Sequence, residues 1–186
     1  MTGIYKITDY GVKKDCKDLQ TREIQSVFDL CKKSGGTVII PCGTYYTGAL
    51  RMWSDTTLIL ENGSELIGSD ICEDYEVFPI PPEAQMRSDM EMITSYYGKP
   101  WDTYRRAIIS VYGGKNIKIT GQGVIDGNDC ADPEGEEGYR GPHGIFITSV
   151  DGVELSDYTI RSCGNFMHEI NNSKNIHINK ISLKKG

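Results

Sequence analysis

The sequence lacks the features that mark several large classes of protein. Its 186 residues contain no apolar run near the ~18–20 residues of a membrane span, and the first residues show no apolar stretch typical of a secretory leader. Basic residues are not in excess, because 20 Lys and Arg face 26 Asp and Glu. Since phosphate binding needs a basic face, this balance argues against nucleic acid. We therefore expect no membrane partner, no nucleic-acid partner and a cytoplasmic location.

Cysteine is present, but not in the patterns that bind metals or carry out redox chemistry. The six cysteines include no Cys-x-x-Cys pair and no Cys-His cluster with zinc spacing. The acidic run around Asp132 does not match a calcium loop, because Cys130 stands where the third oxygen ligand belongs. The sequence thus predicts no metal, no cofactor, and thiols that are reduced and mostly buried. A disulfide framework is the less favoured alternative.

Helical periodicity is also scarce. One stretch, residues 18–33, carries the apolar stripe of an amphipathic helix, formed by Ile24, Val27, Phe28 and Cys31. Asp18 can cap its start, and Gly35-Gly36 can end it with a left-handed residue. After this point we expect short strands at 37–40, 56–61, 64–67, 107–112, 116–120, 123–125, 145–148, 153–155, 158–160, 166–170, 175–178 and 180–183. The 21 glycines indicate many tight turns between them.

A repeat decides how these strands are arranged. The segments that begin at Lys115, Asp151 and Lys174 superpose, with offsets of 36 and 23 residues. A 23-residue period with three very short strands is typical of one coil of a parallel β-helix. The longer coil has room for a loop insertion, the acidic stretch 129–140. A β-sandwich would need longer strands joined by hairpins, and hairpins do not account for the repeat.

We therefore predict an all-β fold, a right-handed single-stranded parallel β-helix of roughly five coils. It forms one domain over residues 1–186, interrupted by an aromatic and proline-rich loop insertion at 73–106 and by the acidic loop insertion at 129–140. The helix covers the open first coil, because the end of a solenoid needs a cap.

Several short motifs follow one another in a recognisable order. They are Tyr10-Gly11, the segment Gly35–Tyr45, Thr47-Gly48, the segment Thr57–Ser69 with Asp74-Tyr75, the segment Asn116–Gly127, and Arg140-Gly-Pro-His143. In this order they resemble pectin-lyase-like β-helix proteins and, within these, the polygalacturonase family, glycoside hydrolase family 28. The resemblance covers essentially the whole chain. It implies an inverting glycosidase that acts on pectin-type, galacturonate-containing polysaccharides or oligosaccharides.

The chain departs from this family in its catalytic motifs. In the family these follow the coils that match here: an Asn-Thr-Asp-Gly-type segment, an Asp-Asp pair, a Gly-His-Gly and an Arg-x-Lys. The sequence contains no Asp-Asp and no Gly-His-Gly. We therefore assign no catalytic residue, expect the catalytic carboxylates beyond Gly186, and predict that this chain is the inactive N-terminal portion of a longer glycosidase.

The repeat gives candidate substrate-binding residues on the strand pair 145–148 and 168–171. Ile145 and Ile147 point inward, so Phe146 and Thr148 point outward. Adding 23 residues places His168 and Ile170 inward and Glu169 and Asn171 outward, facing the substrate groove that the resemblance implies. For His168, a hydrogen-bonded core histidine is favoured over a ligand. For the outward pair, a solvated strand face is the alternative.

Further candidates come from the two insertions. Any of Arg140, Arg105 and Arg106 could bind a sugar carboxylate, and the alternative for each is an ordinary surface or loop-anchoring arginine. Trp101 and other aromatic residues of the first insertion could stack on a sugar, or could pack that loop on the solenoid.

Two other functions stay open beside the hydrolase. One is a pectate-lyase-type β-helix; that resemblance would imply cleavage by calcium-dependent elimination. The other is a non-catalytic carbohydrate-binding or assembly module. The last predicted strands leave an open coil edge, so we also expect either self-association through that end or fraying.

Overall fold

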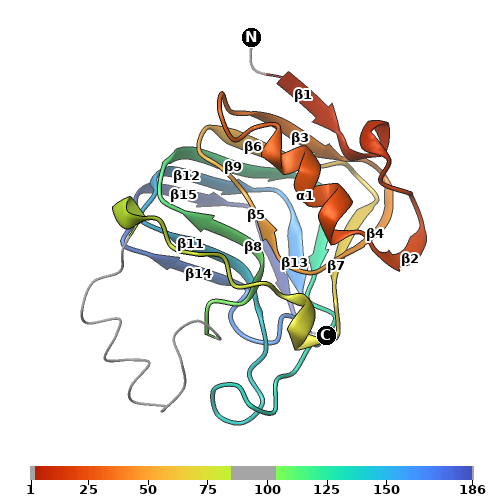
Figure 1. Cartoon of the computed structure of the whole chain (residues 1–186), viewed down its shortest axis with the longest axis vertical. Coiled ribbons are helices and arrows are strands. Elements are labelled where there is room, and N and C mark those ends of the chain that lie inside the picture. The colour runs from red at the N-terminus through yellow and green to blue at the C-terminus, as the bar shows by residue number, and fades with distance from the viewer. Residues whose placement is uncertain (1–2, 85–103, 186) are drawn as a thin grey trace.

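The computed structural model describes residues 3–84 and 104–185, which form a stack of three parallel sheets (Figure 1). Sheet A has the order β1 (Gly3–Lys6), β3 (Gly36–Ile40), β6 (Thr56–Leu60), β9 (Lys115–Gly121), β12 (Asp151–Ser156), β15 (Lys174–Asn179). Sheet B has the order β2 (Cys16–Leu19), β4 (Gly43–Thr47), β7 (Ser64–Gly68), β10 (Val124–Asp126), β13 (Thr159–Arg161), β16 (Ser182–Lys184). Sheet C has the order β5 (Leu50–Arg51), β8 (Ala107–Tyr112), β11 (His143–Thr148), β14 (His168–Asn171).

The chain visits the sheets in the order A, B, C and then starts the next coil. β3 to β14 make four complete coils, with a partial coil at each end of the described stack. Asp151 lies opposite both Lys115 and Lys174, so the repeat found in the sequence is a repeat of stacked coils. The prediction of a parallel β-helix of roughly five coils is confirmed.

The core consists of columns of side chains that point inward from equivalent positions of successive coils. One column in sheet A runs through Val38, Leu58, Ile119, Leu155 and Ile178. Apart from its last member, each of these side chains is fully buried. Each coil therefore buries its apolar side chains against the coils above and below, which is why a 2-residue alternation repeats along such short strands.

The helix α1 (Thr21–Asp29) covers the N-terminal end of this core, as predicted (Figure 1). It buries Ile24, Val27 and Phe28, and it contacts β4, β5 and the 3-10 helix η1 (Ile7–Tyr10). The predicted start at Asp18 is wrong, because Asp18 belongs to β2. The N-cap is Gln20, whose side chain makes no capping hydrogen bond and instead bonds both the N–H and the carbonyl of Lys13.

The corner between sheets C and A uses left-handed residues, one of which recurs at the same position in successive coils. At equivalent positions of successive coils lie Gly35, Asp55, Asn116, Gly152 and Asn175, with φ between 54° and 88°. Asn116 donates a hydrogen bond to Asp55 of the neighbouring coil over 2.7 Å, and Asn175 donates to Asp151 over 2.7 Å. We call this set the corner ladder. Glycine, Asn and Asp tolerate this backbone best, which accounts for the residues that interrupt the strands.

The corner between sheets B and C carries both insertions. β4 and β5 are joined there by Gly48 and Ala49 alone, whereas residues 69–106 follow β7 and residues 127–142 follow β10. The first insertion contains η2 (Cys72–Asp74) and η3 (Pro82–Ala84). Both loops therefore leave the stack beside the same sheet, and both return to begin a strand of sheet C.

At the other end of the stack, inward positions are open to solvent. Ile178 is 56% exposed and Leu183 is 61% exposed, although both continue buried core columns. This matches the predicted open coil edge. Among the described residues, the helices are too short and too polar to cross a membrane.

Candidate functional site

The outer face of sheet C carries two rows of side chains that cross the strands. The first row is Arg51, Ser110, Phe146 and Glu169, and the second is Tyr112, Thr148 and Asn171. The predicted register is confirmed, because Phe146 lies opposite Glu169 and Thr148 lies opposite Asn171. The two rows run along the solenoid axis, so this face is continuous from coil to coil.

Glu169 and Asn171 are the members of these rows that belong to β14, and both are only partly buried. The Asn171 amide donates a hydrogen bond to Glu169 Oε1 over 3.0 Å. Glu169 is the only acidic residue in the four strands of sheet C that the structure describes. The face thus presents one carboxylate and one amide at the last coil.

Phe146 points away from the core axis, as predicted, but its ring is fully buried. It belongs to a second apolar cluster with Ala84, Ala107 and Tyr112, against which Phe78, Ile80 and Tyr104 pack. The inward–outward alternation along β11 predicted the direction of the Phe146 side chain, whereas the residues that bury its ring come from the insertion before β8. In this structure the ring therefore contacts protein and offers no free face to a sugar.

His168 occupies an inward position, in the column of Leu50, Ile109 and Ile145. Its Nε2 lies 2.8 Å from the hydroxyl of Tyr158, a fully buried residue of the same coil. Burial lowers the pKa of His168 to about 4, so the ring is neutral near pH 7. The structure agrees with the favoured prediction of a hydrogen-bonded core histidine.

Arg140 is held by its own loop. Its Nε donates to Glu137 Oε2 over 3.0 Å, and one terminal nitrogen donates to Asn165 Oδ1 over 3.2 Å. The guanidinium also lies over the ring of Phe166, 5.4 Å from its centroid. The hydrogen bond to Glu137 raises the pKa of Arg140, so its charge is permanent but already paired. These contacts favour the loop-anchoring alternative for this residue.

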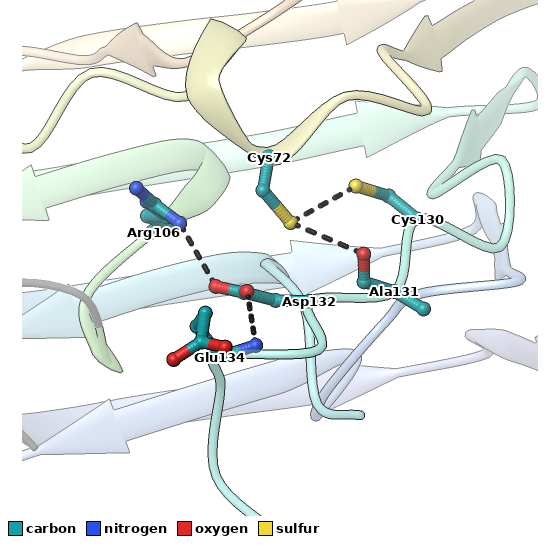
Figure 2. Close-up of polar contacts among 6 residues, drawn as sticks. All are labelled: Cys72, Arg106, Cys130, Ala131, Asp132 and Glu134. Carbon is teal, nitrogen blue, oxygen red and sulfur yellow. Dashed lines mark hydrogen bonds and ion pairs between the residues drawn. The ribbon is translucent and has the colours of Figure 1, made fainter. Parts of the chain in front are cut away.

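Arg105 and Arg106 also anchor loops. Arg105 is 5% exposed and donates to the carbonyl of Phe78 over 2.9 Å. Arg106 makes an ion pair of 2.9 Å with Asp132, whose other oxygen accepts from the N–H of Glu134 (Figure 2). The ion pair joins the segment before β8 to the acidic insertion. It therefore sets the position of that loop beside sheet C.

The first insertion shows the same anchoring role where it is described. Tyr75 is buried, and its hydroxyl donates to the carbonyl of Ser69 over 2.7 Å. Phe78 and Tyr104 pack on the second apolar cluster. Trp101 lies outside the described residues, so its predicted sugar contact stays a prediction.

His143, the first residue of β11, was not singled out as a site residue from the sequence. It is fully buried, and its ring stacks on Phe166 with centroids 5.9 Å apart and meets the edge of Tyr104 at 5.0 Å. Burial lowers the pKa of His143 to about 4. The motif around it was recognised, but periodicity alone does not distinguish a buried histidine from an exposed one.

No group of three or more His, Cys, Asp or Glu side chains that could hold a metal ion occurs within the described ranges. The thiols are buried at Cys31, Cys72 and Cys130, partly buried at Cys16 and Cys163, and exposed at Cys42. The site as described is therefore a sheet face with one carboxylate, flanked by anchored loops.

Comparisons with known proteins fit this geometry. No protein-family model matches the chain. The exo-poly-α-D-galacturonosidase of Dickeya chrysanthemi is 33% identical over 129 residues, which is 67% of this chain and 19% of that protein. The structure of a family 28 exopolygalacturonase from Yersinia enterocolitica matches with a TM-score of 0.71 and 25% identity, over 100% of this chain and 39% of that one.

A third match is a provisionally assigned glycosyl hydrolase from Parabacteroides merdae. It has a TM-score of 0.76 at 24% identity and covers 97% of this chain and 74% of that one. The chain is thus a pectin-lyase-like parallel β-helix. More narrowly, it has the polygalacturonase-like form of that fold, and it spans about a fifth of the Dickeya protein's length.

Proposed function

We propose that this chain forms the first coils of a pectin-degrading glycoside hydrolase of the polygalacturonase type. The observation that carries the proposal is the match to the Dickeya exo-poly-α-D-galacturonosidase. The outer face of sheet C is covered at β8 and β11 and partly open at β14, so a sugar chain could contact this face at its last coil. Glu169 and Asn171 would then contribute to one end of the binding surface.

Hydrolysis needs more carboxylates than this face provides. An inverting glycosidase uses one carboxylic acid to protonate the leaving oxygen and a second carboxylate to activate water, with the two groups roughly 6.5–9.5 Å apart. Within the described strands of sheet C, Glu169 stands alone. We propose that the catalytic pair belongs to coils that stack on β14, and that this chain by itself does not turn over substrate.

The exposed end of the core supports such stacking. Ile178 and Leu183 occupy inward positions that are buried in all four complete coils. Both side chains are more than half exposed, so the stack forgoes part of the about 2 kcal/mol that full burial of each one contributes. Further coils would cover them and extend all three sheets. Self-association through the same end is the alternative cover, and light scattering on the chain distinguishes a monomer from a dimer.

The test combines binding and turnover. We expect calorimetry to detect weak, saturable binding of trigalacturonate. Since Glu169 would lie near a sugar carboxylate, Glu169→Gln should tighten trigalacturonate binding about two- to fivefold by removing like-charge repulsion. Glu154→Gln, the same change on the outer face of sheet A, should leave binding unchanged.

Each outcome bears on a different part of the proposal. No change in trigalacturonate binding on Glu169→Gln would contradict the placement of the sugar beside Glu169. Release of reducing ends from polygalacturonate by the chain alone would contradict the placement of the catalytic pair on other coils. An unsaturated, ultraviolet-absorbing product would favour the lyase alternative, and trigalacturonate binding without turnover in any longer form would favour a carbohydrate-binding module.

A further inference from the structure

Two thiols from different insertions face one another at the corner between sheets B and C. The Sγ atoms of Cys72 and Cys130 lie 3.4 Å apart, although the residues are 58 positions apart in the chain (Figure 2). Both side chains are buried, Cys72 with 6% and Cys130 with 1% of its surface exposed. Among the six cysteines, no other sulfur–sulfur contact is found in the described parts of the chain.

The backbone on both sides of this pair is fixed. The N–H of Tyr75 donates to the carbonyl of Cys72 over 3.1 Å, and the N–H of Cys130 donates to the carbonyl of Gly127 over 3.3 Å. A Cβ atom at Gly141 or Gly164 would come within 2.0 Å of the carbonyl oxygen of Cys130, so main chain packs tightly around it.

Further contacts hold the two segments together. Cys72 Sγ also contacts the carbonyl of Ala131 at 3.5 Å, and the Arg106–Asp132 ion pair restrains the next residue along. The two thiols are therefore held face to face rather than meeting by chance at mobile loops. Figure 2 shows the thiol pair and the ion pair side by side.

We infer that Cys72 and Cys130 form an oxidation site that closes to a disulfide and ties the two insertions together. The bond length of a disulfide is about 2.05 Å, so the sulfurs must approach by roughly 1.3–1.4 Å, which rotation about the side-chain torsions can supply. This inference is independent of the proposed carbohydrate function.

The oxidant is a low-molecular-weight disulfide such as glutathione disulfide. The thiolate of one cysteine attacks this disulfide and forms a mixed disulfide, which releases one glutathione. The second protein thiolate then attacks the mixed disulfide and releases the other glutathione. The protein loses two protons and two electrons, and the glutathione disulfide is reduced to two thiols.

The surroundings govern the rate of this exchange. Burial raises the pKa of both thiols, and the contact between them lowers the pKa of Cys72 while it raises that of Cys130. Cys72 is therefore the better first nucleophile, and the reaction should accelerate as the pH rises.

Two arms test the inference on the whole chain. In one, the native protein is incubated with glutathione disulfide at pH 7 and pH 9. In the other, the protein is refolded from urea in a glutathione redox buffer. We expect a peptide that joins Cys72 to Cys130 in non-reducing digests, formed faster at the higher pH, and a rise in Tm of about 5 °C or more that dithiothreitol reverses.

Matched variants separate this bond from other thiol chemistry. Cys42→Ser removes the exposed thiol and should change neither the linked peptide nor the rise in Tm. Cys72→Ser and Cys130→Ser should each abolish both, with far-UV circular dichroism reporting that the variant is folded. The inference fails if both cysteines stay free to alkylating reagents in both arms while Cys42 becomes glutathionylated. It also fails if the linked protein has a lower Tm than the reduced one.

Discussion

The corner ladder predicts how the stability of the protein changes when Gly152 is replaced by asparagine. Gly152 stands between Asn116 and Asn175 at the equivalent corner position, with φ of 88° against 54° and 56° for the two asparagines. A Cβ atom on Gly152 would lie 3.4 Å from the side-chain oxygen of Asn116, which is ordinary van der Waals contact. An asparagine at this position could therefore donate its amide to Asn116, as Asn116 donates to Asp55.

The magnitude follows from three contributions. Replacing glycine restricts the unfolded chain and stabilises by about 0.4–1 kcal/mol. Alanine in the left-handed region costs about 1–2 kcal/mol, whereas asparagine bears little of this cost. The new hydrogen bond contributes about 0.5–1.5 kcal/mol. Gly152→Asn should therefore raise the free energy of unfolding and Gly152→Ala should lower it. The two variants should differ by about 1.5–3.5 kcal/mol, the left-handed cost of alanine plus the hydrogen bond of asparagine.

Urea unfolding of the wild type and both variants, followed by circular dichroism, measures this difference. The slope m should be the same for the three proteins, because the surface exposed on unfolding is unchanged. In a protein of this size the two variants should differ in Tm by about 3–14 °C. Equal stability of the asparagine and alanine variants would refute the ladder, since it would mean that the amide makes no bond between coils.

Three further predictions concern the same fold. Burial lowers the pKa of His143 and His168 to about 4 from 6.5, so the unfolded chain binds more protons than the folded one below pH 6.5. The free energy of unfolding should therefore be highest above that pH and fall by at most about 3 kcal/mol per histidine towards pH 4. His143→Phe should make the decline of Tm with falling pH less steep. Asp132→Asn should cost about 2 kcal/mol in urea unfolding by leaving its arginine partner unpaired, whereas Asp129→Asn, at an exposed position of the same loop, should cost less than about 0.5 kcal/mol. Ile147→Ala should cost about 2–5 kcal/mol, because the fully buried side chain leaves a cavity between coils, and a smaller loss would contradict the closely packed column.

The architecture could be predicted from the sequence because each coil of a solenoid repeats a similar sequence pattern at a similar spacing. The repeat from Lys115 onwards aligned three coils, and the structure pairs them in that register. Earlier strands were harder to find. β4 has the sequence Gly-Thr-Tyr-Tyr-Thr with no aliphatic residue, and its inward residue Tyr45 carries a polar end. The sequence predicts a helix start at Asp18 because Asp is a good capping residue in isolation, although pairing of β2 with β4 places Asp18 in a strand.

The candidate site was predictable in direction but not in exposure. Alternation placed Phe146 and Glu169 on the same outer row, and the structure agrees. Whether a side chain is covered depends on a loop that comes from another part of the chain, and no local pattern encodes that contact. The arginines illustrate the same limit, because their carboxylate and carbonyl partners are set by loop packing.

The placement of both insertions at one corner makes the two margins of sheet C unequal. On the margin next to sheet A, each complete coil passes to the next strand through a short linker, with left-handed residues such as Ser149 and Asn172 in two of them. On the margin next to sheet B, the linker ranges from two residues to several tens without disturbing the stack. Loops grafted at the second margin should thus be exchangeable between related solenoids, whereas the first is a fixed template. Such proteins can therefore diverge through the loops at the margin next to sheet B while the margin next to sheet A keeps the register of the strands.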